Sequence, residues 1–319
     1  MNVLVISHED VARLLPMDAC IEVMAEAMRT TGRGGAVLPL RSVVWMPDRT
    51  GMIGLMPGFL GAPASLGLKV VSIFPGNHGT GYDSHQGVVM LFDPVTGELA
   101  CIADAREITA VRTAAASAVA TDALARPDAR RLALLGYGEQ AQTHLKAIGK
   151  VRRLETVTVW GRSPERAQAF AERLRAEAGV AVEVATSAQA AVAQADIVCT
   201  VTPAAEPILK GAWLAPGAHV NLVGSSFAGP AEVDSDLVVR SRFIADHREG
   251  VLKQGAEFLI AKAAGLVGDE HVAGEIGEVL SGKIPGRQSP DQITVYKSLG
   301  HIVQDLVSVQ ALLAIPPRG

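Results

Sequence analysis

Arg131-Leu-Ala-Leu-Leu-Gly-Tyr-Gly-Glu-Gln-Ala-Gln-Thr-His144 is the most informative stretch of this chain. Its apolar run, residues 132–135, is typical of a buried parallel strand, and the residues after the glycines have the pattern of a helix. Between them stands Gly136-x-Gly138-x-x-Ala141, which matches the dinucleotide-binding fingerprint in the context that the fingerprint requires. Gly136 permits a tight turn, Gly138 lets backbone N–H groups approach a pyrophosphate, and the helix N-terminus supplies partial positive charge. The alternative is an ordinary tight turn between a strand and a helix.

The chain that follows alternates regularly between strand and helix patterns. Ser163 and Pro164 are a favourable N-cap and first residue for one of the helices. Strands are expected at Thr156–Trp160, Val180–Val184, Asp196–Thr202, His219–Val223 and Phe243–Ala245. This alternation predicts an α/β fold whose dinucleotide-binding domain, residues 121–290, is a Rossmann-type doubly wound parallel sheet.

The first part of the chain has a different pattern. Short apolar runs, cut by Gly and Pro, extend from Val37 to Pro94 and predict a largely antiparallel sheet. A helix is expected over Ile108–Ala125, and one long helix over Ile293–Leu313. Because that last helix is expected to return to the N-terminal region, residues 1–120 with 291–319 are predicted to form a discontinuous α+β domain.

Composition narrows the function classes. Of the 319 residues, 49% are hydrophobic and only 19% are charged, so two ordinary domains can bury sizeable cores. A net charge of −4 gives no reason to expect nucleic acid or a membrane surface as partner. The three cysteines are isolated and none of the eight histidines has metal-ligand spacing, so neither a disulfide framework nor a metal site is predicted. The N-terminus does not resemble a signal peptide, and a cytoplasmic location is expected.

The type of dinucleotide should depend on the residues that follow the second strand of the doubly wound sheet. A carboxylate there binds the ribose 2′-hydroxyl of NAD, whereas a basic residue accommodates the 2′-phosphate of NADP. This chain has Gly161-Arg162-Ser163 at that point. A guanidinium suits a phosphate, and a hydroxyl can add a hydrogen bond. NADPH is therefore the predicted cofactor, with NADH possible but weaker; the alternative is that Arg162 is a solvated surface charge.

Several further segments, in order, resemble the ornithine cyclodeaminase/μ-crystallin family over nearly the whole length. They are Leu38–Arg41, Leu66–Lys69, Ser84–Gly87, Leu91–Pro94, Thr109–Ser117, Gly136–Ala141 and Thr294–Gly300. The resemblance implies a homodimer whose first domain, completed by the C-terminal helix, binds the substrate and the partner subunit. It also implies a nicotinamide cofactor in the cleft.

The resemblance assigns Arg41, Lys69 and Arg112 to a cluster around the substrate carboxylate. Their chemistry suits this role, because guanidinium groups hold carboxylates through paired hydrogen bonds and a lysine adds charge or a proton. Without the family match, each would be read as a surface cation. The cyclodeaminases and archaeal alanine dehydrogenases carry an aspartate where this chain has Ser226. Serine without a partner base is a poor base, so Ser226 and the Arg162 turn favour the ketimine reductase branch.

The resulting hypothesis is a reduction of a cyclic ketimine, Δ1-pyrroline-2-carboxylate or Δ1-piperideine-2-carboxylate, to proline or pipecolate. Arg41, Lys69, Arg112 and Ser226 are the predicted catalytic residues; Ser226 would orient the substrate or cofactor. Ornithine cyclodeaminase or alanine dehydrogenase activity, or a binding protein, are the alternatives. The predicted cofactor-binding residues are Ser84, His85, Arg112, Gly136, Gly138, Glu139, Gln140, Ala141, Gly161, Arg162, Ser163, Thr202, Val223, Lys297 and Ser298.

Overall fold

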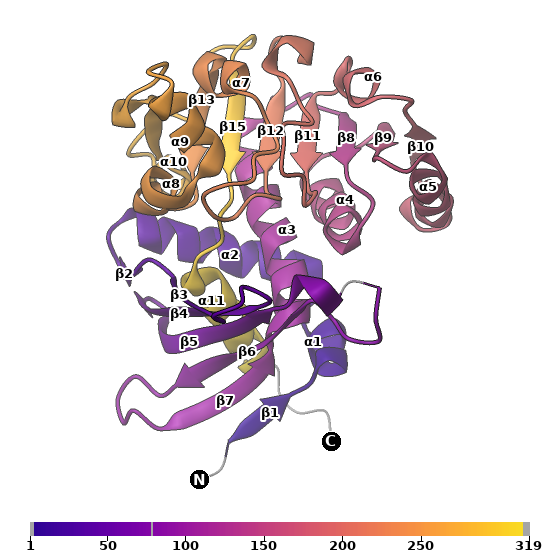
Figure 1. Ribbon diagram of the computed structural model, residues 1–319. Coiled ribbons are helices and arrows are strands. Elements are labelled where there is room, and N and C mark those ends of the chain that lie inside the picture. The colour runs from indigo at the N-terminus through magenta and orange to yellow at the C-terminus, as the bar shows by residue number, and fades with distance from the viewer. Residues whose placement is uncertain (1–2, 78, 315–319) are drawn as a thin grey trace. The chain divides into compact units, whose positions relative to one another are not determined.

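A computed structural model describes residues 3–77 and 79–314 of the chain. It divides into two compact units, the first formed by Met1–Thr113 with His301–Gly319 and the second by Ala114–Gly300 (Figure 1). Each unit has its own sheet. Among the described residues, no helix is both long enough and apolar enough to cross a membrane.

The first unit is a mostly antiparallel sheet with helices packed on it. The strand order is β1-β7-β6-β5-β4-β2, β3 pairs with β4, and only the β1–β7 pair among these is parallel. The strands are β1 (Leu4–Ile6), β2 (Ala36–Val37), β3 (Ser42–Trp45), β4 (Met52–Gly61), β5 (Ala64–Ile73), β6 (His85–Phe92) and β7 (Leu99–Asp104). The helices are α1 (His8–Leu14), α2 (Met17–Gly32), α11 (Ile302–Leu313), the start of α3 (Ala105–Leu124) and the 3-10 turn η1 (Pro75–Asn77). The predicted antiparallel sheet is confirmed.

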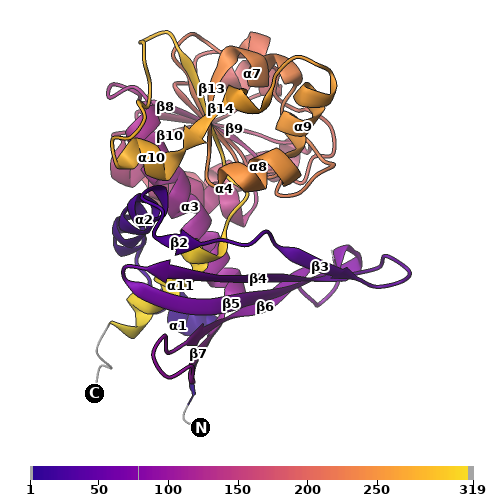
Figure 2. The same cartoon turned by 90° about the vertical axis from the view of Figure 1, so that its left-hand side faces the viewer.

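Helix α11 lies against β4, β5 and β6 (Figure 2). Two glycines allow this close approach. A Cβ at Gly58 would lie 2.3 Å from the side chain of Ile302, and a Cβ at Gly67 would lie 2.4 Å from that of Leu306. Because both positions lack a side chain, α11 can bring its polar residues next to the middle of β5, where Lys69 lies.

The second unit is a doubly wound parallel sheet with strand order β10-β9-β8-β11-β12-β15-β13-β14. Its strands are β8 (Arg131–Leu135), β9 (Thr156–Trp160), β10 (Ala181–Val184), β11 (Ile197–Thr200), β12 (His219–Leu222), β13 (Ser241–Ala245), β14 (Val272–Glu275) and β15 (Ile293–Lys297). Its helices are α4 (Glu139–Val151), α5 (Pro164–Ala178), α6 (Ala188–Val192), α7 (Ser235–Arg240), α8 (Arg248–Gln254), α9 (Ala256–Ala263) and α10 (Ile276–Leu280), with 3-10 turns η2 (Gly211–Trp213) and η3 (Asp269–His271). The predicted Rossmann-type sheet is confirmed, and buried aliphatic residues of β8, β11, β12 and β15 fill its centre.

The expected long helix over Ile293–Leu313 is wrong. Ile293–Lys297 is strand β15, every residue of which is buried, between β12 and β13 in the parallel sheet. Gly300, with φ of +75°, then separates this strand from α11, which begins at Ile302. A buried apolar run has no helical or strand periodicity of its own, so the pattern alone did not distinguish the two. The two compact units of the structure meet in the chain at Thr113/Ala114 and Gly300/His301.

Candidate functional site

A buried ion cluster in the first unit joins two of the predicted catalytic residues. The Lys69 Nζ on β5 lies 2.9 Å from Asp305 Oδ1 on α11 and donates to Thr109 Oγ1 at 2.5 Å. The Arg112 Nε donates to the same oxygen of Asp305 at 3.1 Å, and its Nη1 donates to Gln304 Oε1 at 2.6 Å. Lys69 is 4% exposed, Arg112 5% and Asp305 0%, so one buried carboxylate serves two buried cations.

The sequence arranges this cluster through helical spacing. Thr109 and Arg112 are one turn apart on α3, so they share a face of the helix. Gln304 and Asp305 are adjacent polar residues on the largely apolar α11, and both are fully buried. Among the described residues, Gln304 Nε2 and Asp305 Oδ2 have no hydrogen-bond partner. The cluster can therefore still donate and accept hydrogen bonds.

Charge and burial oppose each other at Lys69. Burial lowers its pKa to about 8, Arg112 and Arg41 lower it as well, and Asp305 raises it. Burial alone would raise the pKa of Asp305, but Arg112 and Lys69 together lower it. The half-buried Arg41 therefore acts electrostatically on the same group. The cluster carries excess positive charge, which is suited to an anionic ligand.

Ser84 and His85 lie in the first unit at the start of β6. The Ser84 hydroxyl and His85 Nδ1 are 3.0 Å apart. Burial lowers the pKa of His85, and the positive charge of Lys69 lowers it further. The exposed His85 is therefore within electrostatic reach of the cation cluster.

The glycine turn in the second unit has the geometry that the fingerprint predicted. Gly136 has φ of +133°, and a Cβ there would lie 2.8 Å from the Val201 carbonyl oxygen, so a side chain is excluded. Gly138 is the N-cap of α4, and the space where its Cβ would stand is open to 4 Å. Ala141 is buried against the sheet. Open space before the N-terminus of a helix is suitable for a pyrophosphate. Glu139 is exposed and Gln140 half-buried at this start of α4.

The turn after β9 contains the three residues predicted to select the dinucleotide. Gly161 is buried, because the ring of Tyr137 occupies the place of a side chain: a Cβ at Gly161 would lie 2.1 Å from that ring. Arg162 is exposed, and the Ser163 hydroxyl caps α5 by accepting from the backbone N–H of Arg166 at 3.2 Å. Arg162 is thus available to a ligand, and the predicted cap of α5 is confirmed.

The last predicted cofactor residues lie at the carboxyl ends of the central strands. Thr202 and Ser226 are half-buried, whereas Val223 and Ser298 are buried. The side chain of Ser298 has no hydrogen-bond partner among residues 3–77 and 79–314. In an open doubly wound sheet, ligands bind outside these strand ends.

Lys297 is held by partners within the second unit. Its side chain is fully buried, its Nζ lies 2.8 Å from Glu257 Oε2, and it donates to the Ser225 carbonyl at 2.6 Å. These contacts enclose the ammonium within the second unit. Lys297 therefore holds the loop after β12, and its predicted contact with the cofactor stays a prediction.

Sequence reasoning missed the buried carboxylate and amide side chains that hold these sites. Asp305 and Gln304 could have been found, because two adjacent polar residues interrupt the apolar pattern Ile302-Val-Gln-Asp-Leu-Val307. Glu232 and Glu257 have no comparable signal, since they acquire partners only through the tertiary fold.

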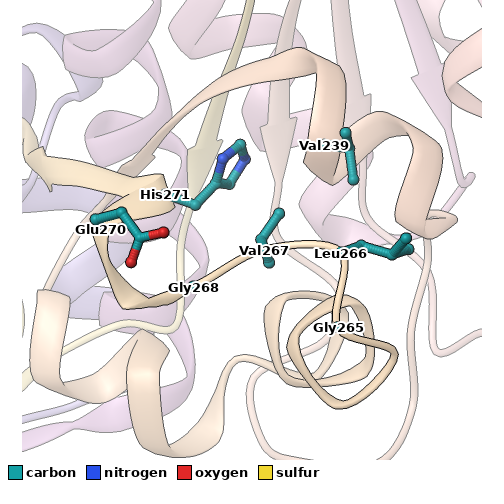
Figure 3. A pocket seen from close by; sticks show the side chains of 7 residues that line it. All are labelled: Val239, Gly265, Leu266, Val267, Gly268, Glu270 and His271. Carbon is teal, nitrogen blue, oxygen red and sulfur yellow. The ribbon is translucent and has the colours of Figure 1, made fainter.

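An open hollow of about 710 Å³ elsewhere in the second unit is a separate feature. Figure 3 shows it between the loop 265–271 and Val239 of α7, with the His271 ring turned to that side. His271 Nε2 lies 2.5 Å from the Val238 carbonyl oxygen. None of the predicted site residues lines this hollow.

The second unit has an open glycine turn on a doubly wound sheet, and the first unit has a buried cation cluster. These features are typical of dinucleotide-dependent oxidoreductases with a Rossmann-type unit. The family model for the ornithine cyclodeaminase/mu-crystallin family matches residues 1–313, and the chain belongs to this family.

Its relatives share most of its length. The ketimine reductase mu-crystallin of Mus musculus is 39% identical over 277 residues, which cover 87% of this chain and 84% of the relative. Δ1-Pyrroline-2-carboxylate reductase of Thermococcus litoralis, solved in complex with NADH and L-proline, superposes with a TM-score of 0.93 at 34% identity, covering 97% of this chain and 96% of that one. An archaeal alanine dehydrogenase dimer with bound NAD has a TM-score of 0.92 at 28% identity, covering 98% and 95%.

Proposed function

We propose that this protein reduces a cyclic ketimine carboxylate, Δ1-pyrroline-2-carboxylate or Δ1-piperideine-2-carboxylate, to proline or pipecolate. The observation that carries the proposal is the buried pair Lys69–Arg112 on the single carboxylate of Asp305. A small anionic substrate with a basic nitrogen suits such a cluster, because the cations bind its carboxylate and the lysine can supply a proton. Relatives that are named ketimine reductase and Δ1-pyrroline-2-carboxylate reductase support the same reaction class.

The residues act in distinct ways. Arg41 and Arg112 hold the substrate carboxylate, which fixes the imine carbon for reaction. Lys69 lends its proton to the imine nitrogen, and its pKa of about 8 keeps the ammonium charged at neutral pH yet acidic enough to donate. Asp305 holds Lys69 and Arg112 in place. A bound nicotinamide supplies the hydride that the imine carbon receives.

The second unit has features that fit a dinucleotide. Gly138 leaves open space at the N-terminus of α4. Gln140 Oε1 and Ser298 Oγ are buried polar atoms without partners among the described residues, as expected where a ligand supplies them. Related structures hold NADH or NAD, which supports a nicotinamide dinucleotide. We propose NADPH as the preferred form, because Arg162 is exposed beside the Ser163 hydroxyl.

We propose that the protein is a homodimer. The β3–β4 hairpin exposes several large apolar side chains, which a second copy of the chain would cover; they are Val43, Val44, Trp45, Met46 and Ile53. Exposed apolar patches of this kind commonly mark protein–protein contacts. The archaeal relative is described as a dimer. Sedimentation velocity of the purified chain tests this state.

The archaeal alanine dehydrogenase favours a second candidate, oxidative deamination of alanine. Ser226 opposes it, because a hydroxyl replaces the carboxylate that the deaminating branch was expected to carry. The test is a parallel assay: cofactor consumption with five- and six-membered imines, ammonia release from ornithine, and NAD⁺ reduction by alanine. We expect the imine reaction to be fastest. Faster ammonia release or alanine oxidation would refute the proposal.

A further inference from the structure

Glu232 is a buried carboxylate that the reaction outlined above does not use. It is 0% exposed and lies in the segment between β12 and α7. Its side chain accepts four hydrogen bonds of 2.7 Å each: from the Thr200 hydroxyl, from the Thr202 backbone N–H and hydroxyl, and from the Gly224 backbone N–H. Thr200 ends β11, and Gly224 follows β12. One carboxylate therefore ties together the carboxyl ends of two neighbouring parallel strands.

A buried ion pair, Glu257 with Lys297, fixes Ser225, the residue that follows Gly224 in the loop after β12. The Glu232 backbone N–H donates to Glu257 Oε1 at 3.1 Å, and Glu257 Oε2 lies 2.8 Å from Lys297 Nζ. Lys297 then donates to the Ser225 carbonyl at 2.6 Å. Gly224 and Ser225 are thus held by two linked charged groups, immediately before Ser226.

The close approach of the two loops requires glycine at position 224. A Cβ there would lie 2.1 Å from the Thr202 carbonyl oxygen and 2.6 Å from the Glu232 carboxyl carbon. Glycine at this position and the four hydrogen bonds of Glu232 therefore specify a single arrangement of the loops. This arrangement lies at the end of the sheet where doubly wound folds bind their ligands.

We propose that Glu232 is a positioning residue for the dinucleotide. It acts by fixing the loops after β11 and β12, and so places Thr202, Val223 and Ser226 for contact with the bound cofactor. The inference rests on the proposed use of a nicotinamide dinucleotide.

The chain offers a matched control in Asp196. This buried carboxylate sits at the opposite, amino end of the same sheet, just before β11. It accepts from the backbone N–H groups of Arg130 and Arg131 at 3.0 Å each and pairs with Arg126 at 2.6 Å. It therefore joins strands much as Glu232 does, but away from the strand ends that bind ligands.

The test compares Glu232→Gln, Thr200→Val and Asp196→Asn by titrating NADPH and NADH in the absence of any imine. In Glu232→Gln an amide NH₂ must face either the Thr202 or the Gly224 backbone N–H, neither of which can turn away. We expect its dissociation constant for the dinucleotide to rise about tenfold. Thr200→Val keeps the shape and removes one donor, and we expect a rise of about threefold. Asp196→Asn should lower the melting temperature, yet its dissociation constant for the dinucleotide should stay within about twofold of the wild-type value.

Two outcomes would overturn the inference. One is Glu232→Gln with wild-type dinucleotide affinity. The other is that Asp196→Asn also loses dinucleotide affinity, and loses as much of it per degree of lowered melting temperature as Glu232→Gln does. If Glu232→Gln does not fold, Thr200→Val decides: unchanged affinity would refute the role. Dinucleotide binding is measured without substrate. A wild-type protein that reduces no imine would therefore refute the proposed function, while the binding comparison would still test the role of Glu232.

Discussion

The Lys69 ammonium lies 2.9 Å from the Asp305 carboxylate, and both side chains are buried. The two residues are far apart in sequence, and they meet because α11 packs onto the glycine-containing strands β4 and β5. Burial lowers the pKa of Lys69 while Asp305 raises it, so the carboxylate keeps the lysine charged near neutral pH. The proton that the proposed reaction needs is thus held by a specific tertiary contact.

The rate should depend on pH through Lys69. Its pKa in the folded protein is about 8, below its ordinary value of 10.5, and the proposed acid must be protonated. Therefore kcat/KM for the imine should be constant about one unit or more below that pKa and fall tenfold per unit well above it. Asp305→Asn removes the group that raises this pKa, so the fall should begin about one to three units lower. An alkaline limb that Asp305→Asn does not move would contradict the role of this pair.

Lys69 and Ser226 should differ strongly as catalysts. Lys69→Gln removes the proposed acid and should lower kcat by about 10²- to 10⁴-fold. Ser226→Ala removes a hydroxyl that is expected only to orient a ligand, so its kcat should fall by less than about tenfold. Single-turnover kinetics at saturating cofactor measure both. Equal losses in the two variants would contradict the separate roles proposed for Lys69 and Ser226.

Arg162 should determine the choice between the two dinucleotides. Arg162→Ala removes the exposed guanidinium and should raise the KM for NADPH by about tenfold or more, while that for NADH changes by less than about threefold. Arg173→Ala, on the exposed surface of helix α5, which begins two residues after Arg162, removes an equal charge and is the matched control. If both variants weaken NADPH equally, general electrostatics rather than a phosphate contact determines the preference.

Two buried histidines should make the second unit sensitive to acid. Burial lowers the pKa of His144 to about 4 and that of His219 to about 3, against 6.5 in the unfolded chain. The unfolded state therefore binds more protons below pH 6.5, and the free energy of unfolding should fall by about 1.4 kcal/mol per unit and per histidine until the folded pKa is reached. Urea unfolding between pH 7 and pH 5 measures this slope. His144→Gln should flatten it; an unchanged slope would contradict the neutral, buried state of His144.

The fold was largely predictable, because its signals are local. The glycine turn between β8 and α4 and the Ser163–Pro164 cap depend on neighbouring residues and were correctly located. Strand β15 was assigned to a helix, since Ile293–Lys297 is uniformly buried and its position in the sheet is fixed only by β12 and β13. Strand β14 was not predicted at all.

The candidate site was predictable in its cations but not in their partners. Lys69 and Arg112 stand in recognisable motifs, whereas Asp305 meets them through packing between segments distant in sequence. Lys297 illustrates the converse. Its motif suggested a cofactor contact, but the buried carboxylate of Glu257 and the Ser225 carbonyl enclose its ammonium.

The most direct test of the central claim is the fate of the hydride. The protein is mixed with a cyclic imine carboxylate and a reduced nicotinamide dinucleotide that carries deuterium at both positions of C4, and the product is examined by mass spectrometry and NMR. Hydride transfer to the imine carbon should place one deuterium on the carbon beside the carboxylate of proline or pipecolate, with one equivalent of cofactor oxidised. Unlabelled product, or ammonia released from ornithine without net oxidation of the cofactor, would contradict it.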